Sequence, residues 1–258
     1  MRYALHAEWT KLRTLASTFW LLLAAAALTT AVSAAAAAAA RCPSGACADD
    51  PAKISLTGIY LGQAVIAVLA VTAVSGEYGT GMIRLTLAAA PRRTAVLAAK
   101  AAIVTSLTLA AGAVAVLGSL LAGRLILPGH GIGPAHGYPA LSFSDSPALR
   151  AGLGSVLYLA LIALLSLGAA TAARDAAAAI GAVLGLLYLF PIIAAAAGNA
   201  TVSRHLEQIG PMTAGMAIQA TTGLNSQPIS PWAGLGMLAA WAAGALLLGG
   251  TLLRLRDA

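Results

Sequence analysis

The 258 residues of the chain are 60% hydrophobic and only 9% charged, with a mean hydropathy of +0.87. Soluble domains carry roughly a quarter charged residues, and a single core stops growing near this length, so the composition excludes a soluble fold and predicts one membrane domain. The 15 Lys and Arg outnumber the 8 Asp and Glu, but they form no dense patch interleaved with aromatic residues, which argues against nucleic acid as a partner.

The first segment, residues 2–16, is predicted to be an amphipathic helix lying in the membrane interface. Leu5, Trp9, Leu12 and Ala16 recur at helical spacing, which would place Trp9 at the depth of the lipid headgroups. The alternative is a positively charged flank without helical order. The apolar run that follows is longer than the ~7–15 residues of a secretory signal, so we expect it to be retained as the first membrane span.

Six apolar stretches are each close to the ~20 residues that cross a bilayer core. They are residues 18–40, 54–74, 101–121, 153–173, 176–196 and 232–253. None contains Asp, Glu, Lys, Arg or His. The expected fold class is therefore all-α integral membrane, with the interfacial helix and six transmembrane helices forming a single domain over residues 1–258.

The basic residues predict the orientation of these spans. With the N-terminus in the cytoplasm, ten Lys and Arg fall in inside segments and five in outside segments, as the positive-inside rule requires. Both termini are then expected in the cytoplasm, and the long segments 122–152 and 197–231 face outward. Within the second of these, residues 211–221 are too short to span but apolar enough to form short re-entrant helices.

Cys42 and Cys47 are the only cysteines, and both fall in the first outward loop. An oxidising exterior permits a disulfide between them, which would close a small loop. Two unpaired thiols are the alternative. A metal site is not expected, because two cysteines without a neighbouring His are too few ligands.

The sequence lacks the residues of several kinds of energy-coupled or catalytic protein. None of its three lysines follows a Gly, so no phosphate-binding loop is present and we expect neither ATP hydrolysis nor a cofactor in this chain. The spans contain no ionisable group of the kind that couples carriers to protons or sodium. Ser155, after Gly154, suggests an intramembrane serine hydrolase, but all four His lie outside the spans and small residues more often serve helix packing.

The loop between the second and third spans, residues 75–94, carries the most informative pattern, S-G-E-Y-G-T-G-M-I-R-L-T-L-A-A-A-P-R-R-T. Its glycines would loosen the exit of the second span, and a short helix over about 80–88 would end before Pro91. Glu77 is expected to pair with Arg84 or to cap the short helix. Three further cations are expected to anchor the next helix at the inner headgroups: Arg92, Arg93 and Lys100.

The E-x-x-G-T…L…P-x-R pattern of this loop resembles the permease subunits of type-2 ATP-binding-cassette (ABC) exporters, common in Gram-positive bacteria. In that family the segment forms a coupling helix that docks on the ATPase. The resemblance implies an ATPase-coupling role for Glu77, Tyr78, Gly79, Thr80, Gly81, Arg84, Pro91, Arg92 and Arg93. Weaker likenesses at residues 8–15, 172–176 and 231–258 extend the match over nearly the whole chain.

The resemblance implies a multi-pass permease of an exporter in a bacterial cell membrane. Such a permease lies beside a second copy or a paralogue, in contact with membrane lipid, and its separate ATPase subunits bind ATP and Mg. A pathway without charges would suit lipids, apolar drugs or amphipathic peptides. Charge reversal at Glu77 is expected to uncouple transport without unfolding the protein. The alternatives are a membrane anchor or sensor subunit that does not transport, and the serine hydrolase.

Overall fold

The computed structural model describes residues 9, 10, 14, 16–42, 50–79, 82, 93–132 and 146–255, and these contain helices and turns but no strand. Six described helices are long and apolar enough to cross a membrane. They are α2 (Ala16–Ala39), α4 (Ile59–Gly79), α6 (Arg93–Ile126), α7 (Ser146–Ala173), α8 (Ala176–Ala196) and α11 (Pro231–Leu255). The predicted all-α membrane fold with six spans is confirmed at this level.

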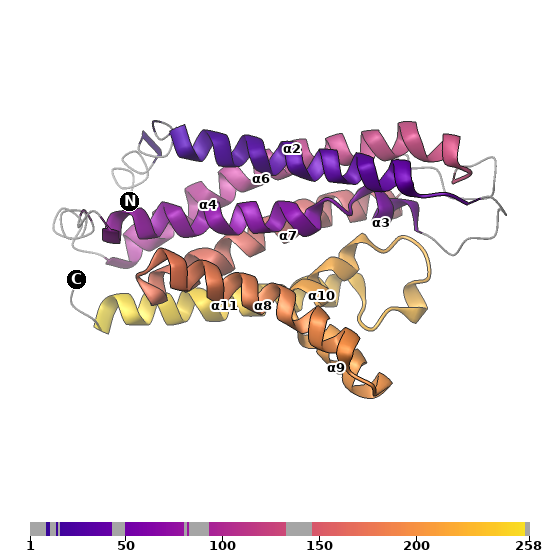
Figure 1. The fold of residues 1–258 in the computed structure, drawn as a ribbon. Coiled ribbons are helices and arrows are strands. Elements are labelled where there is room, and N and C mark those ends of the chain that lie inside the picture. Colours follow the sequence, from indigo (N-terminus) through magenta and orange to yellow (C-terminus); the bar gives the residue numbers. More distant parts are fainter. Residues whose placement is uncertain are drawn as a thin grey trace.

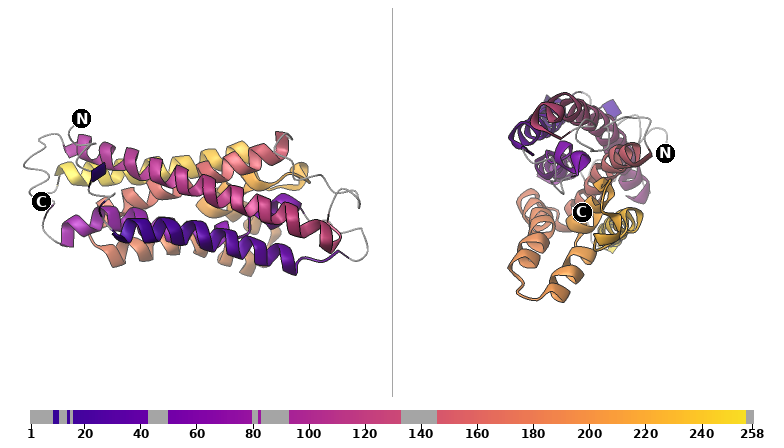
Figure 2. Two further views of the ribbon diagram at one scale, coloured as in Figure 1. Left: turned by 90° about the horizontal axis from the view of Figure 1, so that it is seen from above. Right: turned by 90° about the vertical axis from the view of Figure 1, so that its right-hand side faces the viewer.

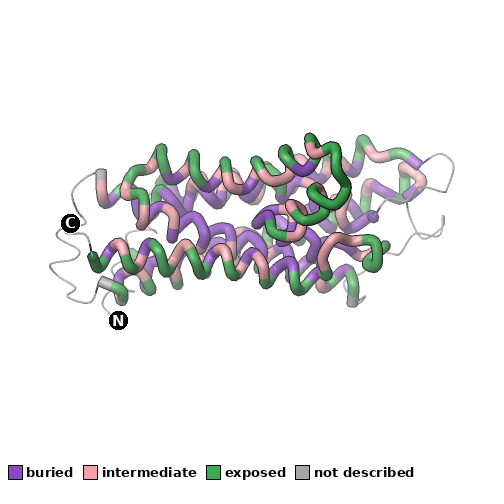
Figure 3. Tube along the Cα trace, turned by 90° about the horizontal axis from the view of Figure 1, so that it is seen from below, coloured by how far each residue is buried: buried purple, intermediate pink, exposed green. Residues whose placement is uncertain are grey.

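The six helices run roughly along one axis as an elongated bundle, and the start of α2 and the end of α11 lie at the same end of it (Figure 1; Figure 2). Helix α7 is the centre of the bundle and packs against α4, α6, α8 and α11. Tyr158, Ile162 and Leu167 of α7 are fully buried. The buried residues, purple in Figure 3, accordingly lie along the middle of the bundle.

The outer helices expose large apolar side chains that only lipid can solvate. In the most apolar stretches of α2, α8 and α11, only 22%, 17% and 22% of the residues are buried, whereas 61% are buried in α7. Trp20, Leu125 and Leu247 are each more than half exposed. Contiguous apolar surface of this extent is rare on soluble proteins, so the structure supports the membrane assignment.

Several helix boundaries differ from the predicted ones. The second span begins at Ile59 instead of residue 54, because Asp50 caps a separate short helix α3 (Pro51–Ser55) and a turn at residues 56–58 follows it. The third helix, α6, has 34 residues and is followed by a 3-10 turn η1 (Leu127–His130). Hydropathy finds only the lipid-crossing part of a helix, whereas the helix continues until caps or prolines end it.

The two ends of the predicted loop 122–152 are helical in the structure, as parts of α6 and α7. Arg124 is in the last turn of α6, and Arg150 lies in the second turn of α7, where its Nη2 donates to the Ala220 carbonyl oxygen. The tight hairpin between the fourth and fifth spans is confirmed. Arg174 adopts φ of 60°, and the Asp175 carboxylate caps α8 by accepting from the Ala178 amide at 2.7 Å.

The last long connection folds into a cap at the end of the bundle opposite to the start of α2 (Figure 1). Helix α9 (Ala200–Ile209) projects sideways with no buried residue, whereas α10 (Pro211–Met216) and the 3-10 turn η3 (Ala217–Gln219) are buried against α7 and α11. A further 3-10 turn, η4 (Leu224–Ser226), precedes α11. The predicted short helices within residues 211–221 are thus present.

Asp50, at the start of α3, ties this cap to the connection between α2 and α4. Its carboxylate accepts hydrogen bonds from the Ala52 amide at 3.0 Å, the Thr221 hydroxyl at 2.6 Å and the Thr222 amide at 3.0 Å. The side chain is almost fully buried, and these donors satisfy its charge where water cannot. Asp50 therefore joins the start of α3 to residues 221 and 222 of the cap.

The N-terminal segment is described only at Trp9, Thr10 and Thr14, which are helical and exposed. The rest of the expected interfacial helix, residues 2–16, lies outside the described residues. The amphipathic helix therefore stays a prediction.

Cys42, at the end of the first span, is buried and takes part in a disulfide bond, while Cys47 lies outside the described residues. We expect the intact mass of protein purified without reductant to show no alkylated thiol, because the exterior is oxidising. Reduction before alkylation should add two alkyl groups. Two alkyl groups in the unreduced sample would contradict the pairing of Cys42 with Cys47.

The orientation of the bundle is testable by cysteine labelling in a background lacking Cys42 and Cys47. Asn225→Cys, in the exposed cap, should react with a membrane-impermeant maleimide in intact cells, and Ala173→Cys only after permeabilisation. The positive-inside asymmetry of ten basic residues against five is the physical reason. Labelling of Ala173→Cys from outside would reverse the orientation.

Candidate functional site

The loop predicted to couple to an ATPase leaves α4 beside a buried ion pair. The Glu77 carboxylate, in the last turn of α4, lies 2.7 Å from the Lys100 ammonium of α6, and the two side chains are only 2% and 4% exposed. Lys100 Nζ also lies 3.5 Å from the Ala73 carbonyl oxygen. The expectation that Lys100 anchors α6 at the headgroups was wrong, because the side chain turns inward to compensate Glu77.

The neighbouring Tyr78 connects this pair to the hairpin of α7 and α8. The guanidinium carbon of Arg174 lies 5.7 Å from the centre of the Tyr78 ring, within the range of a cation–π interaction. We call Glu77, Tyr78, Lys100 and Arg174 the inner-end cluster, because the predicted orientation would place them at the cytoplasmic end of the bundle. It joins α4, α6 and the α7–α8 turn at one end of the bundle.

The inner-end cluster fixes both ends of the predicted coupling segment. A buried ion pair is strongly destabilised when one partner is removed, because the remaining charge has lost its compensation in a poorly solvated place. The chain leaves α4 two residues after Glu77 and re-enters the bundle at Arg93, two helical turns before Lys100. The ion pair therefore links the last turn of α4, where the segment begins, to α6, where the chain re-enters the bundle.

The described structure contains four of the nine predicted coupling residues. Glu77 and Tyr78 belong to the cluster, Gly79 ends α4, and Arg93 begins α6. The other five lie outside the described residues: Thr80, Gly81, Arg84, Pro91 and Arg92. The pairing of Glu77 with Arg84 accordingly stays a prediction.

The sequence alone did not reveal the roles of Lys100 and Arg174 in this cluster. Lys100 is the last charge before the third apolar stretch, and Glu77 is the first charge after the second. Opposite charges at the same edge of two consecutive antiparallel spans indicate an ion pair between the two helices. The periodicity of a single helix does not reveal such a pair. Arg174 is the only basic residue of the hairpin turn.

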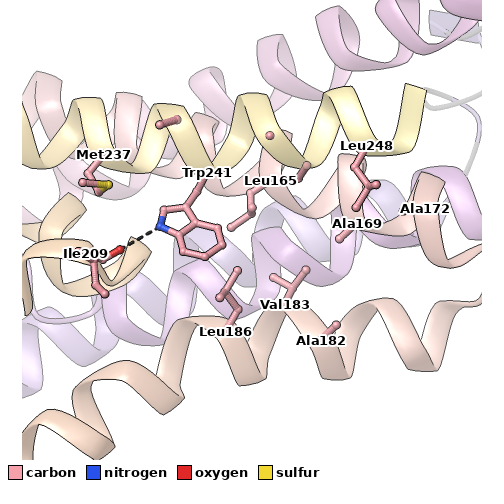
Figure 4. Close-up of a pocket in the computed structure, with 13 residues that line it drawn as sticks. Leu165, Ala169, Ala172, Ala182, Val183, Leu186, Ile209, Met237, Trp241 and Leu248 are labelled. Carbon is pink, nitrogen blue, oxygen red and sulfur yellow. Dashed lines mark hydrogen bonds between the residues drawn. The ribbon is translucent and has the colours of Figure 1, made fainter. Parts of the chain in front are cut away.

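A second candidate site is an apolar groove of about 530 Å³ between α8 and α11, with α7 as its floor (Figure 4). Trp241 of α11 reaches across it and donates its indole N–H to the Ile209 carbonyl oxygen at 2.9 Å, so this polar atom is satisfied. No charged residue lines the groove. The lining residues are Leu165, Ala169, Ala172, Ala182, Val183, Leu186, Ile209, Met237, Ala240, Trp241, Gly244, Ala245 and Leu248.

The one amide side chain of the predicted spans, Gln63, holds helices together. Its Oε1 accepts from the Tyr158 hydroxyl of α7, and its Nε2 lies 3.3 Å from the Tyr60 carbonyl oxygen and 3.1 Å from the Met212 sulfur of α10. Gln63 and Tyr158 are fully buried. Because each polar atom has a partner, the network fits a structural role in binding α10 to α4 and α7.

Ser155, the serine of the hydrolase alternative, is fully buried and its hydroxyl has no hydrogen-bond partner in the described part of the chain. The described His130 lies in η1, directly after α6, and His205 lies in α9, so neither belongs to the helix of Ser155. A Cβ on the preceding Gly154 would lie 2.0 Å from Cγ1 of Ile218. These observations favour the packing interpretation of Gly154 and Ser155.

Comparison with known proteins gives no further assignment. No family model matches the chain, and no curated sequence matches it significantly.

Proposed function

We propose that the chain is the membrane-spanning permease of an ATP-driven exporter, working with a second permease and with separate ATPase subunits in a bacterial cell membrane. The proposal starts from the likeness of residues 75–94 to the coupling segment of type-2 ABC exporters. The observation that carries it is the inner-end cluster. A docking segment can move helices only if its ends are firmly attached to them, and the Glu77–Lys100 pair supplies that attachment.

The apolar groove supports an apolar or amphipathic substrate for this exporter. Its lining presents aliphatic and aromatic groups without any charge, as do many sites that bind drug-sized apolar molecules. The mechanism proposed is alternating access. ATP binding brings the ATPase subunits together, their movement displaces the coupling segment, and α4 and α6 rearrange so that substrate is released outward.

The proposal is tested by purifying the tagged chain from its native membranes in mild detergent. We expect a Walker-motif ATPase to co-purify and to hydrolyse ATP in a vanadate-sensitive manner. In the reconstituted complex, Thr80→Pro should reduce substrate-stimulated hydrolysis sharply, because proline disfavours the helical conformation of the preceding Gly79 and so changes how the segment leaves α4. Ala200→Pro, at the exposed first residue of α9 where proline is tolerated, is the matched control and should leave hydrolysis unchanged.

Two outcomes would contradict the proposal. A monodisperse chain with no associated ATPase would favour the anchor or sensor function. An ATPase that co-purifies but is equally active with Thr80→Pro would remove the coupling role from this segment.

A further inference from the structure

A second cavity, of about 440 Å³, lies in the cap at the other end of the bundle from the inner-end cluster. It is bounded by α3, by the C-terminal part of α9 and by the buried α10 and η3. Its wall is mixed. Lys53, Glu207 and Gln219 provide polar groups, and several aliphatic side chains complete it: Ile54, Pro191, Met212, Met216 and Ile229.

The polar groups of this cavity are not neutralised by each other. Lys53 donates to the neutral Gln227 Oε1 at 3.2 Å, and neither Lys53 nor Glu207 forms an ion pair with any described residue. Both side chains are partly buried. One cationic and one anionic group therefore line the same cavity, more than a salt-bridge distance apart.

Gln219 supplies the independent sign that a ligand belongs here. Its side chain is 3% exposed, and its Nε2 has no hydrogen-bond partner among the described residues. Leaving a buried amide donor unpaired costs about 1–3 kcal/mol. An acceptor oxygen entering the cavity would remove that cost, and Lys53 favours an acceptor that carries negative charge.

We propose that this cavity binds the headgroup of a zwitterionic phospholipid of the phosphatidylethanolamine type. Its phosphate oxygens accept from Lys53 and Gln219, and its ammonium lies against Glu207. Tyr60, the second residue of α4, lines the cavity and is 45% exposed, so the site opens to the surface of the bundle at the end of a membrane span. The aliphatic wall accommodates the glycerol and the first methylenes. This inference does not depend on the transport proposal.

The test measures binding of dihexanoyl-phosphatidylethanolamine to the delipidated full-length protein by calorimetry, below the micellar concentration of the lipid. Dihexanoyl-phosphatidylglycerol, which has the phosphate but no ammonium, is the comparison lipid. Lys53→Met should weaken the binding of both lipids about tenfold or more, as expected for a lost hydrogen bond to a charged group. Glu207→Gln should weaken only the binding of phosphatidylethanolamine, and the preference of the protein for this lipid should then disappear.

Gln219→Leu separates binding from folding. It removes the unpaired donor, so the lipid-free protein should melt at the same or a higher temperature, while phosphatidylethanolamine binds more weakly. Arg204→Gln, on the same helix as Glu207 but outside the cavity wall, is the matched control and should bind normally. Each variant is first shown to be monodisperse, and Lys53→Arg should retain binding if the charge is what matters.

Three results would overturn the proposal. One is equal affinity of wild-type protein for the two lipids, and another is an Arg204→Gln defect as large as that of Glu207→Gln. The third is free phosphoethanolamine binding as tightly as the lipid, since this would make the ligand a soluble zwitterion and leave the aliphatic wall without a role.

Discussion

Lys100→Met is expected to lower the free energy of unfolding by about 3–5 kcal/mol, because it removes the ammonium 2.7 Å from the buried Glu77 carboxylate. Glu77→Lys should be at least as damaging, since it places two ammonium groups in the same buried space. The measurement is the SDS-induced unfolding of purified protein, together with its thermal melting in detergent. Thus charge reversal at Glu77 is not the mild change that a loop position had suggested.

The control for Lys100→Met is Arg254→Met, which removes a cation from the exposed end of α11 and should change stability by less than about 0.5 kcal/mol. The exchange Glu77→Lys with Lys100→Glu should recover part of the loss, because it restores opposite charges. If Lys100→Met were as stable as wild type, the ion pair would not be the attachment that the coupling proposal requires.

Gly168→Ala and Gly249→Ala should each destabilise the protein by about 1–3 kcal/mol, through overpacking between α7 and α11. A Cβ on Gly168 would lie 2.5 Å from the carbonyl carbon of Ala245, and one on Gly249 would lie 2.6 Å from the Gly168 oxygen. These neighbours are backbone atoms of packed helices, so they can move aside only if the helices separate. Thermal melting and SDS-induced unfolding measure the loss.

Gly244→Ala is the matched control on α11. A Cβ there meets no atom within 4 Å, because the residue lines the apolar groove. Alanine favours a helix over glycine by roughly 0.5–1 kcal/mol, so this variant should be as stable as wild type or slightly more stable. Equal behaviour of Gly244→Ala and Gly249→Ala would mean that α7 and α11 are not held by close backbone contact.

Apolar length and the absence of internal charge were sufficient to predict the six spans, because crossing a bilayer imposes both on the sequence. They could not reveal where a helix continues past the lipid. The extensions of α6 and α7 depend on caps and hydrogen bonds such as that of Arg150, which involve residues distant in sequence. The separation of α3 from α4 likewise depends on Asp50, whose partners Thr221 and Thr222 lie at the far end of the chain.

The candidate sites were less predictable, because each is formed between helices. The sequence indicated Glu77 but not that Lys100 is its partner, since periodicity describes one helix at a time. The apolar groove and the cavity lined by Lys53 and Glu207 have no local motif at all. Gln219 is an example, because the fold leaves its side-chain Nε2 donor buried without a partner. Its neighbours in the sequence do not predict this.

The length of α6 limits how the protein can sit in a bilayer. At 1.5 Å per residue its 34 residues extend about 51 Å, well beyond the ~30 Å of a hydrocarbon core. Its charge-free stretch runs from residue 101 to residue 123, between Lys100 and Arg124, and extends about 35 Å. A hydrocarbon core positioned within that stretch would have the Glu77–Lys100 pair at one of its boundaries. Thinning or thickening of the bilayer would shift that boundary relative to the pair, so hydrophobic mismatch would change its hydration and its strength.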